Sequence, residues 1–437
     1  MTTSTHLLRS RRFLPLFITQ LLGAFNDNLF KNAMVLFVVY NVYNSEAAEA
    51  RFSALASGVF ILPFFVLSAL AGQLADMRDK ARIIRIVKAC EIVIMLVGGG
   101  GLVLAWLGVD VEQLAIPMLL LALFAMGVHS TFFGPIKYAI LPQHLHDNEV
   151  LAGTGIVEAG TYIAILAGTI LAGWIQAEIA AIGVILVAIL GYFTGRQVPP
   201  APPLIPAQPL DYHVIRSSIA LVRNTLHRRQ VFLAIMAISF FWTIGAVLFI
   251  QFPPLAKNVL TASKEVASLF LVVFSIGVAI GSMVINALLK GTVSARYSPI
   301  SVIVMGLFVV AFYMVCRLWV PHPERGLMDV AAFIAQPLAI PLMLTLLGVA
   351  ISGGMFVVPL YAFLTTFVPK SETARTIAAN NIVNSGAMVV GSLIAVGLSA
   401  AKVALVDQLL LSAAMCLGSA WLGRLLYLAE KHPLPAE

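Results

Sequence analysis

The sequence contains few charged residues and few cysteines. Asp, Glu, Lys and Arg make up only 11% of the chain, against 60% hydrophobic residues, and the mean hydropathy is +0.97. So little charge excludes an ordinary water-soluble protein and predicts one embedded in lipid. The three cysteines, Cys90, Cys316 and Cys416, lie in separate apolar runs. They support neither a disulfide framework nor a zinc site and are expected to be small buried hydrophobes.

The chain also lacks the motifs of several function classes. No basic and aromatic repeat accompanies the net charge of +7, so no nucleic-acid partner is expected. The His and Asp pair of glycerolipid acyltransferases and the Ser nucleophile elbow are both missing, so we expect no enzyme, no cofactor and no metal. Gly98–Gly101 has no following Lys-Ser or Lys-Thr, which favours close helix packing over phosphate binding. His144, His146 and Asp147 are expected to form a solvated loop.

The first apolar run, residues 13–40, is too long for a cleavable signal and carries charge at its centre. As a helix it extends about 42 Å, more than the ~30 Å of a hydrocarbon core. Gln20, Gly23, Asp27 and Lys31 recur at helical spacing and form one polar stripe. Charges at mid-membrane cost several kcal/mol and are tolerated mainly where they pair or serve a pathway. The stripe is therefore a candidate functional site.

Long apolar runs dominate the rest of the chain and predict an all-α membrane protein with twelve transmembrane helices. A proline-rich polar stretch, residues 197–229, separates an N-terminal six-helix half (1–196) from a C-terminal half (230–437), and we expect it to be a cytoplasmic linker that is helical from about Tyr212. The expected spans are 13–43, 53–75, 83–108, 113–138, 148–175, 178–196, 230–256, 264–290, 298–320, 334–366, 374–400 and 403–428.

The basic residues predict an orientation. If Lys88 is counted with the loop after the second span, the two tails and the even-numbered loops hold nineteen Lys and Arg, against six in the opposite loops, including Arg325 and Lys402. This asymmetry predicts that both termini are cytoplasmic. Only Lys31 and Lys137 then remain within the membrane, and Glu91, near Lys88, is expected to be a structural residue at the cytoplasmic end of its helix.

The two halves contain similar segments. Gly155-Ile-Val-Glu-Ala-Gly160 in the fifth span resembles Asn381-Ile-Val-Asn-Ser-Gly386 in the eleventh. Both occupy the fifth position of their half, which favours two parallel repeats around a site near the bilayer midplane.

The loop after the second span reads Gly72-Gln-Leu-Ala-Asp76-Met-Arg78-Asp-Lys80-Ala-Arg82. Gly72 permits close approach of a neighbouring helix, and Asp76 can pair with basic groups or a helix N-terminus. An ordinary positive-inside loop with a chance Asp is the alternative. The pattern resembles the cytoplasmic signature of the major facilitator superfamily, and twelve spans with a central linker agree with that family.

Three motifs resemble a narrower group. Gln20-Leu-Leu-Gly-Ala-Phe-Asn-Asp-Asn28, Phe133-Gly-Pro-Ile-Lys-Tyr-Ala-Ile-Leu141 and Gly353-Gly-Met-Phe-Val-Val-Pro-Leu360 look like the bacterial lysophospholipid transporters of this superfamily. The resemblance implies that lysophospholipids, such as lysophosphatidylethanolamine, enter laterally and move from the outer to the inner leaflet of the bacterial inner membrane by alternating access. It also implies a separate cytoplasmic-side acyltransferase and acyl-carrier-protein synthetase as a partner, membrane lipids around the protein, and a monomer.

Such a substrate needs a small charged pocket beside an apolar wall. Lys137, and with it Lys31, can meet the phosphate, while Asp27 can meet an ethanolamine ammonium or pair with Lys137 in the empty site. Two alternatives remain open: Asp27 and Lys31 as a self-neutralising pair, and Lys137 snorkelling to the interface.

In the later spans, Glu158 lies where the family has a Glu and is expected to line the cavity, to accept a proton, or to be a structural carboxyl. Asn384 stands where relatives carry an acid, and Gln251 lies where some carry a basic residue. The candidate substrate-binding residues are Gln20, Asp27, Asn28, Lys31, Lys137, Tyr138, Glu158, Gln251, Asn381 and Asn384, and the candidate conformational latch is Gly72, Asp76, Arg78, Lys80 and Arg82. The alternative function is a proton-coupled carrier or exporter of another amphiphile, with Asp27 or Glu158 as the proton site.

Overall fold

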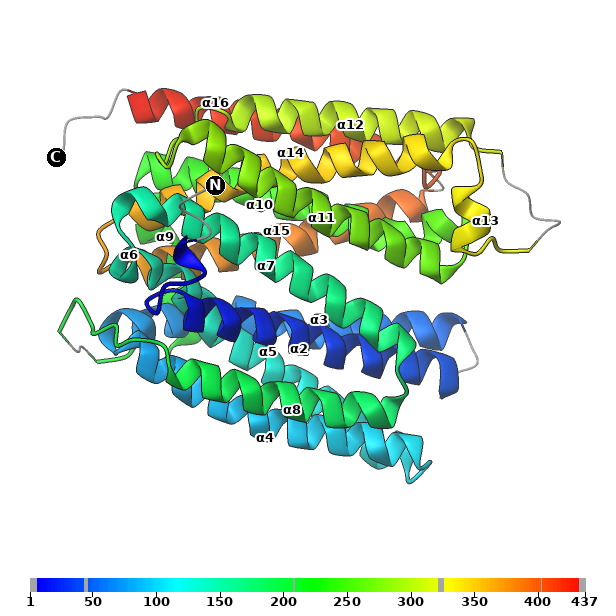
Figure 1. Ribbon diagram of the computed structural model, residues 1–437, viewed down its shortest axis with the longest axis horizontal. Helices are drawn as coiled ribbons and strands as arrows, with labels where there is room; N and C mark the ends of the chain where they lie inside the picture. Colours follow the sequence, from blue (N-terminus) through cyan, green and yellow to red (C-terminus); the bar gives the residue numbers. More distant parts are fainter. Residues whose placement is uncertain (1–5, 43–45, 207–208, 321–325, 402, 432–437) are drawn as a thin grey trace. The chain divides into compact units, whose positions relative to one another are not determined.

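The computed structural model describes residues 6–42, 46–206, 209–320, 326–401 and 403–431, and these residues are mostly helical. The long helices are visible in Figure 1. Eleven helices in the described part of the chain are long and apolar enough to cross a membrane. The predicted all-α membrane fold is thus confirmed. Both chain ends lie outside the described residues. So do Arg325 and Lys402, two of the basic residues counted in the prediction of the orientation.

One compact unit contains Met1–Gly153, Ile163–Thr225 and Val368–Ile382. It is built mainly from the helices that precede the linker, together with the linker helix α9 and the first turns of α15. Its elements are α2 (Leu14–Asn41), α3 (Glu46–Met77), α4 (Lys80–Trp106), η1 (Val111–Ala115), α5 (Ile116–Ala139), α6 (Leu141–His144), most of α7 (Asp147–Trp174), α8 (Ala177–Arg196), α9 (Val214–Leu226) and the start of α15 (Thr373–Ala400).

The other compact unit contains Thr154–Tyr162, Leu226–Phe367 and Val383–Glu437. It therefore includes the middle of α7 and the larger part of α15. Its other helices are α10 (Arg229–Asn258), α11 (Lys264–Leu289), α12 (Ser298–Leu318), α13 (Val330–Ile334), α14 (Ala339–Thr366) and α16 (Leu409–Lys431).

The same helix pairings occur in both units. In the first, α2 and α4 pack on α8, and α3 and α4 pack on α5; in the second, α10 and α12 pack on α16, and α11 and α12 pack on α14. Counted from the start of each half, these are the same positions. The repeat predicted from two short segments is therefore present in the helix packing itself.

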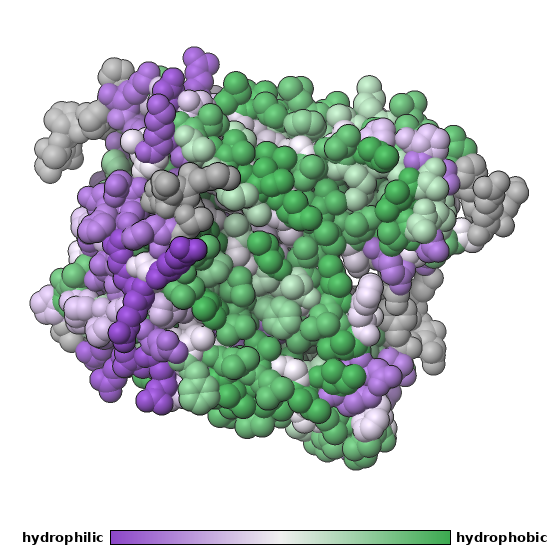
Figure 2. Space-filling view, viewed as in Figure 1, coloured by the Kyte–Doolittle hydropathy of each residue, from purple (hydrophilic) through white to green (hydrophobic). Residues whose placement is uncertain are grey.

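The first predicted span is α2, which has 28 residues but is not among the eleven apolar helices. Its polar stripe lowers its mean hydropathy, so the residues predicted to form a site also weaken the membrane-span signal of this helix. Elsewhere, on the face shown in Figure 2, hydrophobic side chains cover the middle of the helices and hydrophilic ones gather towards helix ends. This distribution fits a lipid environment, where the apolar belt of each helix meets hydrocarbon.

The glycine run of α4 serves helix packing, as the sequence predicted. A Cβ added to Gly98 would lie 2.6 Å from the Phe30 ring of α2, and one added to Gly99 would lie 3.1 Å from the Ala181 carbonyl of α8. Side chains at these positions would push α2 and α8 away from α4. Close packing of α2 and α8 on α4 therefore accounts for glycine at these two positions.

Candidate functional site

The polar stripe of α2 makes contacts with several helices of its unit. Asp27 is half-buried, and its Oδ2 accepts a hydrogen bond of 2.5 Å from Ser130 Oγ on α5. Its Oδ1 is buried and has no hydrogen-bond partner among the described residues. Asn28 donates to the Ala24 carbonyl of its own helix at 2.8 Å, and Gln20 is buried. Asp27 is thus held on one oxygen and keeps the other available.

The two lysines predicted to meet a phosphate are both half-buried. Lys31 places its Nζ 5.5 Å from the centre of the Phe60 ring on α3. Lys137 places its Nζ 4.8 Å from the ring of Tyr138, which is itself buried. An aromatic face stabilises an ammonium weakly, by about 0.5–2 kcal/mol. Each of the two amines therefore lies beside an aromatic face.

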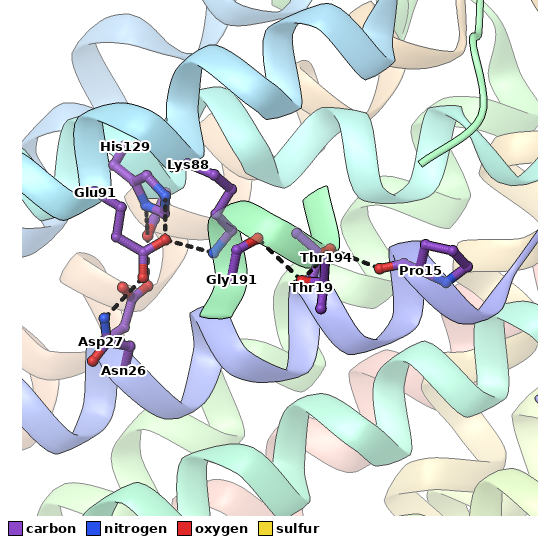
Figure 3. A network of polar contacts seen from close by, with 10 residues as sticks. Pro15, Thr19, Asn26, Asp27, Lys88, Glu91, His129, Gly191 and Thr194 are labelled. Carbon is purple, nitrogen blue, oxygen red and sulfur yellow. Dashed lines mark hydrogen bonds and ion pairs between the residues drawn. The ribbon is translucent and has the colours of Figure 1, made fainter. Parts of the chain in front are cut away.

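A second group of charges lies deeper in the same unit, around Glu91 of α4. Glu91 Oε2 is 2.6 Å from Lys88 Nζ and 3.2 Å from His129 Nε2, and its Oε1 accepts a hydrogen bond of 2.9 Å from Asn26. We call Asn26, Lys88, Glu91 and His129 the Glu91 cluster. Figure 3 shows its members converging on the carboxylate from α2, α4 and α5. All four are buried, so each charge depends on its neighbours in place of water.

The Glu91 cluster connects to Asp27 through neighbouring residues. His129 Nδ1 lies 3.4 Å from Ser130 Oγ, which in turn donates to Asp27. On the other side of the cluster, Lys88 reaches between α2 and α8: its Nζ would lie 2.7 Å from a Cβ added to Gly23 and 3.6 Å from one added to Gly191. A line of polar groups therefore runs from the half-buried Asp27 to the buried Lys88.

A third group of residues lies near the end of α3. Asp76 is buried, its Oδ2 is 3.1 Å from Arg375 Nε, and its Oδ1 accepts a hydrogen bond of 3.3 Å from the Ala374 backbone N–H. Both partners are in the first turn of α15, so a basic group and a helix N-terminus face the same carboxylate. A Cβ on Gly72 would lie 2.7 Å from that of Ala378, which explains why α3 needs a glycine there.

The remaining basic residues of this predicted latch have different surroundings. The Lys80 backbone N–H donates to the Ala201 carbonyl of the linker at 3.0 Å, and the Lys80 side chain is buried. Arg78 and Arg82 are exposed. Asp79 caps α4 by accepting from the N–H of Ala81 at 2.8 Å. Lys80 is therefore tied to the linker, whereas the two arginines face outward.

Two predicted site residues in the other unit, Asn384 and Gln251, make neutral hydrogen bonds. Asn384 accepts a hydrogen bond of 2.6 Å from Ser239 Oγ, and Gln251 donates to Gln408 Oε1 at 3.1 Å. Glu158 is buried in the middle of α7, one turn before Tyr162. Tyr162 stacks on Trp242, with 6.1 Å between ring centres, and Trp242 donates to the Tyr361 hydroxyl at 2.8 Å. Asn381, by contrast, belongs to the first unit. Its Nδ2 would lie 3.4 Å from a Cβ added to Gly134.

Two sequence-based assignments were wrong. Lys88 was counted as a loop residue and Glu91 was placed at a helix end, but both are in the interior of α4, with side chains 0% and 1% exposed. The asymmetry of basic residues persists without Lys88. The spacing of Lys88 and Glu91, three residues apart in an apolar run, was the signal that could have identified a buried pair.

Two partners of these charges were not predicted from the sequence. His129 was not singled out, although it is the one ionisable side chain between Leu119 and Gly134, and Arg375 was counted only as a loop charge. Within the described residues there is no group of three or more His, Cys, Asp or Glu side chains arranged to hold a metal. His144 Nε2 instead lies 3.3 Å from the Pro200 carbonyl of the linker.

Comparison with known proteins gives consistent results. The model of the Major Facilitator Superfamily matches residues 16–392. The chain is 23% identical over 393 residues to a lysophospholipid transporter LplT of Cronobacter sakazakii, and 26% identical over 390 residues to the LplT of Klebsiella pneumoniae subsp. pneumoniae. Each alignment covers 87% of both proteins.

Solved structures of low sequence identity share the fold. The crystal structure of a bacterial homologue of the iron transporter ferroportin, in an outward-facing state, matches with a TM-score of 0.68 at 12% identity, over 97% of this chain and 100% of that one. The human organic anion transporter MFSD10 (TETRAN) matches with a TM-score of 0.69 at 12% identity, over 96% and 98%. At this identity the likeness concerns the fold alone.

Proposed function

Because the chain belongs to the major facilitator superfamily, whose members are transporters and not enzymes, we propose that it is a lysophospholipid transporter. The proposed reaction moves lysophospholipids such as lysophosphatidylethanolamine from the outer to the inner leaflet of the bacterial inner membrane. One observation carries the proposal: the Asp27 stripe and the Lys137 motif occur in a chain that aligns with LplT proteins over 87% of its length.

The chemistry of α2 and α5 suits a phosphate with a cationic headgroup. Asp27 Oδ1 has no hydrogen-bond partner in the described structure and can accept a bond from an ethanolamine ammonium. Either Lys137, beside Tyr138, or Lys31, beside Phe60, can bind the phosphate, and Gln20 and Asn28 belong to the same stripe of α2 as Asp27 and Lys31. A substrate with both charges would therefore find complementary groups on two helices of one unit.

The other predicted residues are proposed to line the substrate path or to form the conformational latch. Glu158, Gln251, Asn381 and Asn384 are expected to line the substrate path. The buried Asp76, with Arg375 and the start of α15, is expected to hold one end closed and to release it during alternating access, with Gly72 permitting the close approach. Arg78, Lys80 and Arg82 complete the predicted latch.

The cellular setting is proposed from the same similarity and from the basic residues. We expect both termini and the Asp76 end of the helices to be cytoplasmic. The returned lysophospholipid would be reacylated by a separate acyltransferase and acyl-carrier-protein synthetase, and the transporter itself would be a monomer with lateral substrate entry.

Delivery of labelled lysophosphatidylethanolamine to the inner leaflet of spheroplasts tests the function. Asp27→Asn and Lys137→Gln are expected to lower uptake about 10- to 100-fold, the value of one charge-assisted hydrogen bond. Asp110→Asn and Lys257→Gln are the matched controls, because they remove equivalent charges from exposed positions. Wild-type uptake by both site variants would refute the assigned roles, and competition by sugars or cationic drugs in place of lysophospholipids would refute the substrate.

The second candidate is a proton-coupled carrier of another amphiphile. The continuous line of polar groups from Asp27 through Ser130 and His129 to Glu91 favours it, because such a line can hold a proton. Glu158 is the alternative proton site. A protonophore separates the two candidates: uptake that collapses with the proton gradient supports coupling, and unchanged uptake removes it.

A further inference from the structure

The strongest unassigned feature is an apolar groove of about 460 Å³ in the unit that contains α9. Its volume falls in the usual range of small-molecule sites, roughly 300–1,000 Å³. Three elements form its walls: α3, the start of α15 and one face of the linker helix α9. The lining residues are Phe65 and Val66 of α3, Ile382 of α15, and Val214, Ile215, Ser218, Ile219, Val222 and Arg223 of α9.

The groove is open at the surface of the described structure and almost wholly apolar. Ile215 is 76% exposed, Ile219 is 64% exposed and Phe65 is 53% exposed. Exposed apolar side chains on an amphipathic helix are costly in water but not beside lipid. Phe65 and Ile382 also belong to helices apolar enough to span a membrane. These exposed apolar side chains suit hydrocarbon surroundings, and an acyl chain is an apolar molecule that such surroundings supply.

Two polar groups mark one part of the groove. Arg223 lies on its wall and is exposed. Ser218, one turn earlier, has a buried Oγ without a hydrogen-bond partner in the described structure. A guanidinium binds phosphate oxygens well, and an unpartnered buried hydroxyl is unfavourable until a ligand satisfies it. A phosphate-bearing glycerolipid supplies groups for both.

The position of the groove relates it to the Asp76 contacts. Phe65 lies eleven residues before Asp76 on α3, about 16 Å along the helix. At the Asp76 end, α3 meets α15 through Arg375 and Ala378. Beyond that contact, Phe65 and Ile382 border the groove, so a chain in it lies along α3 and α15 on the membrane side of the closed end.

From these observations we infer that the groove binds the acyl chain of a lysophospholipid, with Arg223 at its phosphate and Ser218 at its glycerol. The inference rests on the proposed function and extends it, because it assigns a site at the cytoplasmic leaflet where a lysophospholipid dwells beside α9. The lining residues form one apolar surface, which suits a lipid with one acyl chain.

Photocrosslinking of the full-length protein tests the inference. A benzophenone amino acid at Val222 faces the groove, and the same group at Ala220 is the control on the exposed face of α9. The probe is radiolabelled palmitoyl lysophosphatidylethanolamine in nanodiscs of phosphatidylcholine. Crosslinking at residue 222 is expected to saturate and to be displaced by the unlabelled lipid. Three other compounds are expected to displace the probe only at concentrations at least about tenfold higher. Palmitate lacks the phosphate, glycerophosphoethanolamine lacks the acyl chain, and a diacyl phosphatidylethanolamine carries an extra chain.

Matched arginine variants test the phosphate contact. Arg223→Gln is expected to weaken the apparent affinity about tenfold, whereas Arg216→Gln, which removes the same charge from the same helix outside the groove, should stay within about twofold. Equal effects of both variants, equal labelling at residues 220 and 222, or equal competition by the diacyl lipid would each overturn the inference. Uptake by spheroplasts distinguishes failure of the groove assignment from failure of the proposed function. Uptake of lysophosphatidylethanolamine without saturable labelling at residue 222 rejects lipid binding in the groove and leaves the transport function standing. Specific labelling without uptake rejects transport.

Discussion

The two units use the same helix pairings but hold different kinds of polar group. In the first, the Glu91 cluster joins a carboxylate, an ammonium and an imidazole in the interior. In the second, Ser239 bonds to Asn384 and Gln251 bonds to Gln408, all neutral. Buried charges become strongly destabilising when one partner is lost, whereas neutral pairs cost much less. The comparison indicates that a common packing scheme holds a charged cluster in the first unit and neutral hydrogen-bonded pairs, in addition to the buried Glu158, in the second.

The charged interior should be the most sensitive to single substitutions. Glu91→Gln leaves Lys88 buried without its carboxylate, so we expect the free energy of unfolding to fall by roughly 3–5 kcal/mol. Denaturation in detergent, followed by tryptophan fluorescence, measures the loss. The double variant Lys88→Met with Glu91→Gln removes the unpaired charge and should regain most of that stability. Equal stability of the single and double variants would contradict the pairing.

Filling the space that the Lys88 side chain occupies should reduce stability by a smaller amount. Gly23→Ala places a methyl 2.7 Å from the observed Lys88 Nζ position and displaces the amine from Glu91. We expect a loss of about 1–3 kcal/mol, as for other overpacked interiors. Gly58→Ala is the control, because no atom lies within 4 Å of its added Cβ. Equal melting temperatures of the two variants would argue against the tight fit.

The glutamine pair of the second unit should be less sensitive still. Gln251→Leu leaves Gln408 Oε1 without the donor observed here, at an expected cost of about 1–2 kcal/mol. Replacing both residues with Leu should regain part of the loss, because both amides are removed together and the Val403 carbonyl, which accepts from Gln408 Nε2 at 3.1 Å, is the group that loses a donor. A loss as large as that of Glu91→Gln would remove the contrast between the units.

The smallest effect is expected at Ser239. Ser239→Ala removes one neutral donor to Asn384 and should cost about 0.5–1.5 kcal/mol. Thr243→Val is a useful comparison on the same helix, because the Thr243 hydroxyl donates only to the Ser239 backbone carbonyl of its own helix. The melting temperatures of the two variants compare the interhelical hydrogen bond with the local one. An equal decrease in both variants would show that the interhelical bond contributes no more stability than the local bond.

The helices themselves were largely predictable from the sequence. The span expected at 83–108 is α4 at Lys80–Trp106, and the one expected at 148–175 is α7 at Asp147–Trp174. The linker helix expected from about Tyr212 begins at Val214. The span expected at 334–366 begins later, at Ala339, because the chain first forms the short helix α13 and then passes Pro337, which disfavours a helical residue before it.

Sequence alone determined the all-helical membrane fold and the polar stripe that contains Asp27. Both follow from local rules: apolar length sets where a helix can cross lipid, and helical spacing sets which residues share a face. The partners of the charges were decided only by tertiary structure. Whether Glu91 meets solvent or Lys88 and His129, and whether Asp76 meets Arg375 almost three hundred residues later, depends on which helices pack together. Lysine at a helix end and lysine in a buried pair have the same hydropathy, so only packing distinguishes them.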